Sequence, residues 1–130
     1  MGYANPQITI PYIYTGIDFG AGDKAASFQG PAGMVGTLRE VVLPNVTEVF
    51  NSVTTEGQIK IGTAGNDDAY ALINLGDLAA TDTFITSQDD TDGIILDDIP
   101  ADTQVEVVFV APTGGTPTGI ADVQIVVDWY

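Results

Sequence analysis

Carboxylates are the side chains of this chain best suited to chemistry, and they are densest in one short stretch before Gly93. The candidate metal ligands in that stretch are Asp89, Asp90 and Asp92. Hard cations such as Ca²⁺ bind several carboxylate oxygens at once, which makes the group a candidate calcium loop. The spacing does not fit an EF-hand, because aligning Gly93 with its glycine puts Gln88 at the first ligand position and Ile99 at the glutamate position. A solvated acidic loop is the simpler interpretation, and we expect no bound metal or cofactor.

Other catalytic arrangements have little support in the sequence. Two carboxylates could carry out glycoside hydrolysis, but with eighteen acids in 130 residues some pair will lie at a suitable distance by chance. The chain has no histidine and no cysteine, so it lacks the commonest general base, a thiolate zinc site, a cysteine nucleophile and disulfides. Gly114-Gly115 is not a phosphate-binding loop, because no Lys or Ser follows in the required order. We expect no catalytic residues and no enzymatic activity.

The charge balance restricts the partners. Lys24, Arg39 and Lys60 are the basic residues, and the net charge is −15. Such a chain repels a phosphate backbone and an anionic membrane surface, so we expect neither nucleic-acid nor membrane binding. No window approaches the ~20 apolar residues of a membrane-spanning helix, and no secretory signal precedes the short apolar run from Ile8 to Tyr14. We therefore expect a soluble protein made in the cytoplasm.

The elements that position these side chains are predicted to be strands, most clearly in the last quarter of the chain. Residues 105–111 are rich in β-branched side chains with one acid, Glu106, which predicts a strand buried on both faces for most of its length. In the final segment alternate positions are apolar, namely Val123, Ile125, Val127 and Trp129. Eight residues of Pro, Gly and Thr separate the two runs. This pattern predicts a long antiparallel hairpin in the middle of a β-sandwich.

The middle of the chain adds shorter strand candidates and no 3.6-residue period. Strands are expected at 37–43, 46–50, 58–62, 83–86 and 93–96, whereas 69–75 fits a strand or a short helix. Pro44-Asn45 is expected to end the first of these strands. About eight short strands in one domain predict an all-β fold, a single-domain antiparallel β-sandwich. A jelly roll is the first choice and another Greek-key sandwich the second, with residues 36–130 forming its body.

Residues 1–35 are the least regular part, and we expect an irregular N-terminal arm there. Apolar residues alternate from Ile8 to Tyr14, but Pro11 interrupts them, so the segment is at best an edge strand or an extended arm. The aromatic residues fit core packing or protein contacts, and Trp129 is assigned to the core or to a subunit seam. The interface candidates are Ile8, Ile10, Tyr12, Tyr14, Val108, Val110 and Trp129.

Four stretches resemble a known group of viral proteins. They are Gly36–Arg39 through Val46–Phe50, Ile59–Gly65, Asp68–Ala71, and Ala111–Gly119 leading into Val123–Tyr130. Together they look like the capsid decoration, or cement, proteins of tailed bacteriophages. The resemblance covers about two-thirds of the chain, from Gly36 onward, and it consists of glycine and strand patterns. Residues 1–35 have no counterpart in it.

The resemblance implies a virion structural protein with a β-sandwich or jelly-roll body. Such proteins bind the outer surface of the phage head, bridge major capsid protein subunits and often form homotrimers. Three copies would carry 3 × −15 = −45, so a trimer seam must be apolar or hydrogen-bonded; Val108, Val110 and the aromatic N-terminal segment are its candidates. A receptor- or glycan-binding module of a head or tail fibre is the alternative. An acidic protein from a salt-rich habitat would explain the charge equally well.

Overall fold

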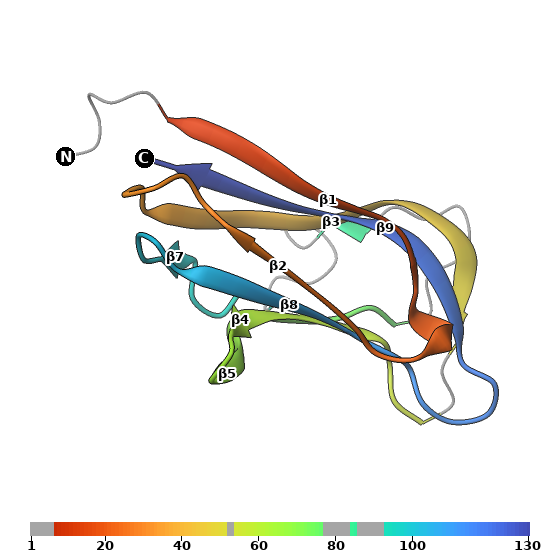
Figure 1. The fold of residues 1–130 in the computed structure, drawn as a ribbon. Coiled ribbons are helices and arrows are strands. Elements are labelled where there is room, and N and C mark those ends of the chain that lie inside the picture. The colour runs from red at the N-terminus through yellow and green to blue at the C-terminus, as the bar shows by residue number, and fades with distance from the viewer. Residues whose placement is uncertain (1–6, 52–53, 77–83, 86–92) are drawn as a thin grey trace.

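Two antiparallel sheets packed face to face form the protein (Figure 1). The computed structural model describes residues 7–51, 54–76, 84–85 and 93–130. The all-β sandwich predicted from the sequence is confirmed. The candidate calcium ligands Asp89, Asp90 and Asp92 lie outside the described residues. The only helical element in the described part is a short 3₁₀ turn, η1 (Phe19–Ala21).

The strand order of the two sheets is that of a jelly roll. The five-stranded sheet contains β1 (Ile8–Asp18), β9 (Thr118–Trp129), β3 (Gly36–Asn51) and β6 (Phe84–Ile85) in that order, with β7 (Asp98–Ile99) also paired to β3. The four-stranded sheet contains, in order, β2 (Lys24–Gln29), β8 (Gln104–Val110), β4 (Gln58–Thr63) and β5 (Asn66–Asn74). The pairs β1·β9, β2·β8, β3·β6 and β4·β5 are nested along the chain and alternate between the sheets.

The predicted C-terminal hairpin is wrong. β8 pairs with β2 and β4, whereas β9 pairs with β1 and β3 in the other sheet. The Pro/Gly/Thr connector between them crosses from one sheet to the other, a distance of about 10 Å. In a jelly roll the last two strands face each other across the core, so the predicted topology and the predicted hairpin were incompatible. β8 and β9 would each have one apolar face whether they paired in one sheet or faced each other across the core. The alternation of apolar residues therefore does not distinguish these two arrangements.

The burial predicted for residues 105–111 is also corrected. Val105, Val107 and Phe109 are buried, but Val108 and Val110, which alternate with them, are half-buried. They lie on the outer face of the four-stranded sheet, on the side away from the core. The final segment follows its predicted register, with Val123, Ile125, Val127 and Trp129 all inside.

Residues 8–29 are not an irregular arm. β1 and β2 lie there and contribute an edge strand to each sheet, and the edge strand foreseen at Ile8–Tyr14 continues to Asp18. The β1·β9 register continues without a shift across Pro11, which pairs with Val126. A proline nitrogen carries no hydrogen, so in this unbroken ladder it faces away from β9. The prediction failed because the turn signals at Gly16 and Gly22 marked a bulge and a tight corner, both at positive φ, instead of a long loop.

Three smaller differences concern strand ends. β3 continues through Pro44, which falls at a register shift between Val42 and Asn45 where the ladder needs no donor. Residues 69–74 belong to the strand β5, so this segment is not helical. The strand expected at 93–96 is only an isolated bridge from Ile94 to Ala71, and β7 follows it.

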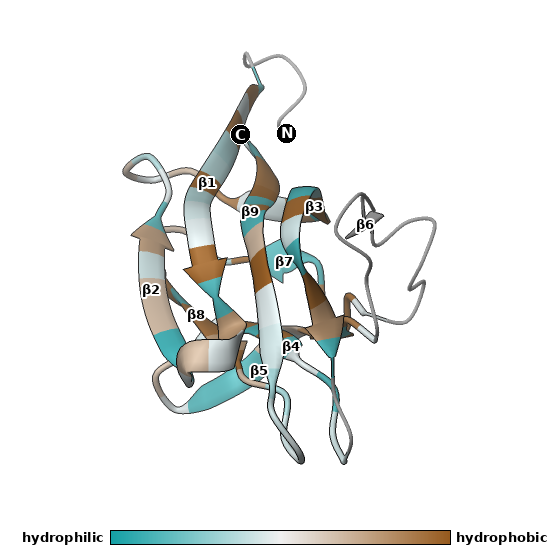
Figure 2. Ribbon diagram, turned by 90° about the vertical axis from the view of Figure 1, so that its right-hand side faces the viewer, coloured by the Kyte–Doolittle hydropathy of each residue, from teal (hydrophilic) through white to brown (hydrophobic). Residues whose placement is uncertain are grey.

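The core between the sheets is apolar and dense around aromatic rings. Phe19 lies within 4.9 Å of Phe50 and 5.8 Å of Phe109 between ring centroids. Figure 2 shows hydrophobic and hydrophilic residues interleaved along β1, β9 and β3, as expected for strands with one buried face. At one end of the core a Cβ on Gly30 or Gly36 would come within 2.5 Å of the Trp129 ring. Glycine is therefore required at both positions.

Candidate interaction surfaces

The aromatic interface candidates of β1 face inward. By register, Ile10, Tyr12 and Tyr14 lie on the core side of the sheet, opposite Val127, Ile125 and Val123. Tyr12 stacks on Phe28 with 4.0 Å between ring centroids, and Tyr14 meets the Phe109 ring edge-on at 5.7 Å. These side chains fill the space between β1 and β2 within one chain. Their apolar area is therefore largely buried by intrachain contacts and is not available to a partner. Ile8 alone in this group is largely exposed, at 43%.

Trp129 belongs to the core, the first of the two places expected for it. Trp129 is 1% exposed, and its Nε1–H donates a hydrogen bond to the Tyr12 hydroxyl at 3.0 Å. Burial raises the pKa of Tyr12, an effect that the hydrogen bond from Trp129 partly offsets. Burial also raises the pKa of Tyr14, and the neighbouring Tyr12 adds to the effect. The trimer seam hypothesis therefore loses the aromatic N-terminal segment and keeps Val108 and Val110.

Val108 and Val110 lie on the outer face of the four-stranded sheet, far from Ile8. Cross-strand register places Ala25, Val108, Lys60 and Leu72 in one row across all four strands. A second row joins Val110, Gln58 and Asn74, and the Gln58 amide donates to the Asn74 side chain at 2.7 Å. The structure thus divides the predicted interface residues between two separate places.

A surface that sequence reasoning missed lies at the end of the sandwich where β1 begins and the described chain ends (Figure 1). Val35 and Tyr130 are joined by two backbone hydrogen bonds, of 2.9 and 3.0 Å. Val35 is 45% exposed and Tyr130 is 38% exposed. We call these two residues the terminal surface. No local pattern in the sequence indicates it.

A groove of about 330 Å³ opens in the terminal surface. It is lined by Val35, Gly36, Thr37, Asp98, Ile99, Pro100 and Tyr130. Most of these groups are apolar, while Asp98 provides an exposed carboxylate and the Thr37 and Tyr130 hydroxyls bond to each other at 2.5 Å. The groove can receive an apolar side chain with a cationic or hydrogen-bonding end.

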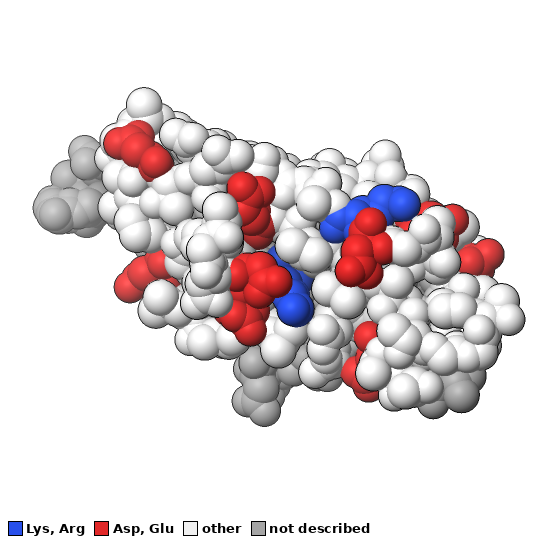
Figure 3. Space-filling model, turned by 60° about the horizontal axis from the view of Figure 1, so that its bottom comes forward, with Lys and Arg blue, Asp and Glu red and all other residues white. Residues whose placement is uncertain are grey.

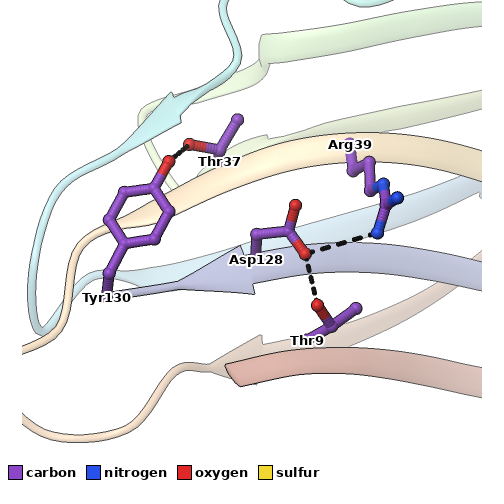
Figure 4. A network of polar contacts seen from close by, with 5 residues as sticks. All are labelled: Thr9, Thr37, Arg39, Asp128 and Tyr130. Atoms are coloured by element: carbon purple, nitrogen blue, oxygen red, sulfur yellow. Dashed lines mark hydrogen bonds and ion pairs between the residues drawn. The ribbon is translucent and has the colours of Figure 1, made fainter. Parts of the chain in front are cut away.

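Polar contacts hold the three strands behind this groove in place (Figure 4). Asp128 on β9 accepts a hydrogen bond from the Thr9 hydroxyl on β1 at 2.5 Å and lies 3.6 Å from the Arg39 guanidinium on β3. The Asp128 side chain is only 14% exposed, so its contacts are partly shielded from solvent. Together with the Tyr130–Thr37 bond they connect β1, β9 and β3 at their common end. The terminal surface is therefore mounted on a rigid support.

The charged groups form no metal site in the part of the chain that the structure describes. Over residues 7–51, 54–76, 84–85 and 93–130, no three acidic side chains converge in a way that could hold an ion. Figure 3 shows acidic side chains as separate groups with uncharged surface between them, and the basic groups in view lie against acidic ones. In the described part of the chain, the Lys60 ammonium lies 3.5 Å from the Asp67 carboxylate. No helix in the described part is long and apolar enough to cross a membrane.

Comparison with known proteins adds no assignment. No protein-family model matches the chain, and no curated protein or solved structure matches it either.

Proposed function

We propose that this protein is a non-enzymatic structural component of a phage virion that binds the outer surface of the head and stabilises it by bridging major capsid protein subunits. The observation that carries the proposal is the terminal surface. It presents Val35 and Tyr130, each at least 38% exposed, beside a groove and on a support of three connected strands. Large apolar side chains gathered at one place on a rigid body are typical of a protein-binding surface.

The charge of the chain supports the outer side of the shell as the binding site. At −15 the protein repels packaged DNA, and the shell separates the two when the protein is outside. Many copies on one shell act in parallel, so each contact needs only modest affinity. The apolar residues Tyr130 and Val35 would be buried against exposed capsid edges, and this contributes roughly 25 cal/mol per Å² of apolar surface removed from water.

The test uses particles stripped of this protein. Wild-type protein added back is expected to rebind the shells and to raise their melting temperature. The double variant Val35→Asp/Tyr130→Asp places two acids in the terminal surface and should reduce rebinding at least about tenfold, since burying an unpaired carboxylate costs more than 1.4 kcal/mol. The matched control is Val49→Asp, because Val49 is 46% exposed and lies on β3 away from this surface.

Three results would count against the proposal. Wild-type protein that does not rebind, or that rebinds without raising the melting temperature, contradicts a bridging role. Equal loss of binding in the control contradicts the terminal surface as the site. Binding of the protein to host cells or glycans, with shell stability unchanged, would favour a receptor-binding module instead.

A further inference from the structure

A row of four side chains crosses the outer face of the five-stranded sheet beside the groove. On β1, β9 and β3 the row contains Thr9, Asp128 and Thr37, in that order. On β7 it ends with Asp98, which is opposite Thr37. Residues opposite each other on antiparallel strands project to the same side of the sheet. The row therefore places two acids, Asp128 and Asp98, on one face.

The two acids of the row differ in their partners. Asp128 is 14% exposed, accepts a hydrogen bond from Thr9 and lies 3.6 Å from the Arg39 guanidinium (Figure 4). Asp98 is exposed, and its carboxylate has no hydrogen bond or ion pair with any residue that the structure describes. Asp98 is thus an unpaired acid in the wall of the groove.

The chain has no basic side chain left to pair with Asp98. Its three bases, all among the described residues, are Lys24, Arg39 and Lys60. Arg39 contacts Asp128, as described above. Lys24 and Lys60 belong to the four-stranded sheet, where Lys60 already lies beside an acid. A side-chain cation that faces Asp98 would therefore come from another molecule.

The rest of the groove suits the stem of a long side chain. Val35, Ile99 and Pro100 give it apolar walls, and its volume of about 330 Å³ accommodates one side chain. An inorganic cation such as Ca²⁺ takes six to eight oxygen ligands, and one carboxylate does not provide them. One carboxylate among apolar walls instead matches a group that is apolar along its length and charged at its end.

We infer that the groove binds an arginine side chain of a partner protein. The inference rests on the proposed function only for the identity of that partner, the major capsid protein. Arginine fits better than lysine because its planar guanidinium can bond both oxygens of Asp98 and stack on the ring of Tyr130, which also lines the groove. A cationic anchor on the partner is also complementary to a chain of net charge −15.

A neutral sugar is the other class of ligand that an aromatic ring and hydroxyls could bind. The groove is less well matched to it, because the hydroxyls of Thr37 and Tyr130 bond to each other at 2.5 Å. Among the side chains that line the groove, Asp98 is then the polar group without a partner. One carboxylate selects a cation more directly than it selects a polyhydroxyl compound.

NMR titration of the full chain with N-acetyl-arginine amide in about 0.15 M NaCl tests the chemistry of the groove. The backbone amides of Val35, Thr37, Ile99 and Tyr130 are expected to shift together, with a dissociation constant of about 1 mM. N-acetyl-citrulline amide, which has nearly the same shape and no charge, should not produce saturable shifts. Asp98→Asn should weaken arginine binding about three- to fivefold.

The matched control for Asp98→Asn is Asp97→Asn. Asp97 is also exposed but does not line the groove, so its variant removes the same charge from a neighbouring position and should change binding less than about twofold. Rebinding to stripped shells should follow the same order, with a loss of about three- to tenfold for Asp98→Asn and little loss for Asp97→Asn. Circular dichroism melting shows that each variant is folded.

Several results overturn the inference. They are citrulline amide binding as well as arginine amide, no shift of these amides with arginine amide up to ~50 mM, equal effects of the two variants, or a neutral methyl glycoside shifting the amides where arginine amide does not. The capsid proposal fails separately. Wild type that rebinds shells no better than Asp98→Asn refutes only the arginine site, whereas wild type that binds arginine amide but not shells refutes only the capsid function.

Discussion

Replacing Tyr12 by Phe should destabilise the protein by a measurable amount, because the change leaves the Trp129 indole without its acceptor. The Tyr12 hydroxyl accepts the Nε1–H of Trp129 at 3.0 Å, and Trp129 is 1% exposed. A buried donor that loses its partner costs ~1–3 kcal/mol, and the half-buried position of Tyr12 favours ~1–2 kcal/mol since water can partly replace the hydroxyl. The ring stack on Phe28, at 4.0 Å, stays in place.

The expected shift in melting temperature follows from the size of the chain. At ~2.1 cal/mol/K per residue, 130 residues give an unfolding entropy of about 0.27 kcal/mol/K, so ~1–2 kcal/mol lowers the midpoint by ~4–7 °C. Thermal unfolding followed by circular dichroism measures the shift. The emission of the single tryptophan reports directly on the affected site.

Tyr130→Phe is the matched control. It removes the same atom from a residue that is 38% exposed, where water replaces the bond to Thr37. The control should stay within ~2 °C of wild type. If Tyr12→Phe and Tyr130→Phe melt at the same temperature, the Tyr12–Trp129 bond contributes nothing and the reasoning is wrong.

Three further predictions concern packing, pH and salt. Gly36→Ala should cost ~1–3 kcal/mol, because its Cβ would come within 2.5 Å of the Trp129 ring, whereas Gly65→Ala, with nothing within 4 Å, should change stability by less than ~0.5 kcal/mol in urea unfolding. Burial raises the pKa of Tyr12 and Tyr14 above the usual value of about 10, so the unfolded chain loses these two protons at a lower pH than the folded chain does. The free energy of unfolding should therefore be unaffected below pH ~10 and fall as the pH rises above it. The fall should be less steep in the double variant Tyr12→Phe/Tyr14→Phe, and an equally steep fall in that variant would contradict the prediction. Raising NaCl from ~10 mM to ~1 M should raise the melting temperature by screening the −15 charge, and a fall would show that specific ion pairs outweigh the repulsion.

Local alternation predicted which residues face the core but not which strands pair. The register of Val123, Ile125, Val127 and Trp129 was foreseen correctly, since a period of two needs only one buried face. The C-terminal hairpin was predicted wrongly, because two strands that each have one apolar face can bury it equally well as neighbours in one sheet or as partners facing each other across the core. β2 and the second half of β1 were not predicted, because prolines and glycines that suggested loops occupy an edge, a bulge and corners.

The candidate surfaces depend still more on tertiary structure. Val35 and Tyr130 are far apart in the sequence, and only strand pairing at one end of the sandwich brings them together. From the sequence, Tyr12 and Tyr14 were candidates for contact with a partner protein. In the structure their rings pack against Phe28 and Phe109 of the same chain.

The composition determined that the chain is strongly acidic and lacks histidine and cysteine, and the order of its residues gave the alternating pattern of an all-β sandwich. Only the tertiary structure decided that Arg39 lies beside Asp128 and Lys60 beside Asp67, each base next to an acid of a neighbouring strand. The physical reason is that charge and hydropathy are properties of single residues, whereas a surface is defined by the register between strands that are distant in the chain.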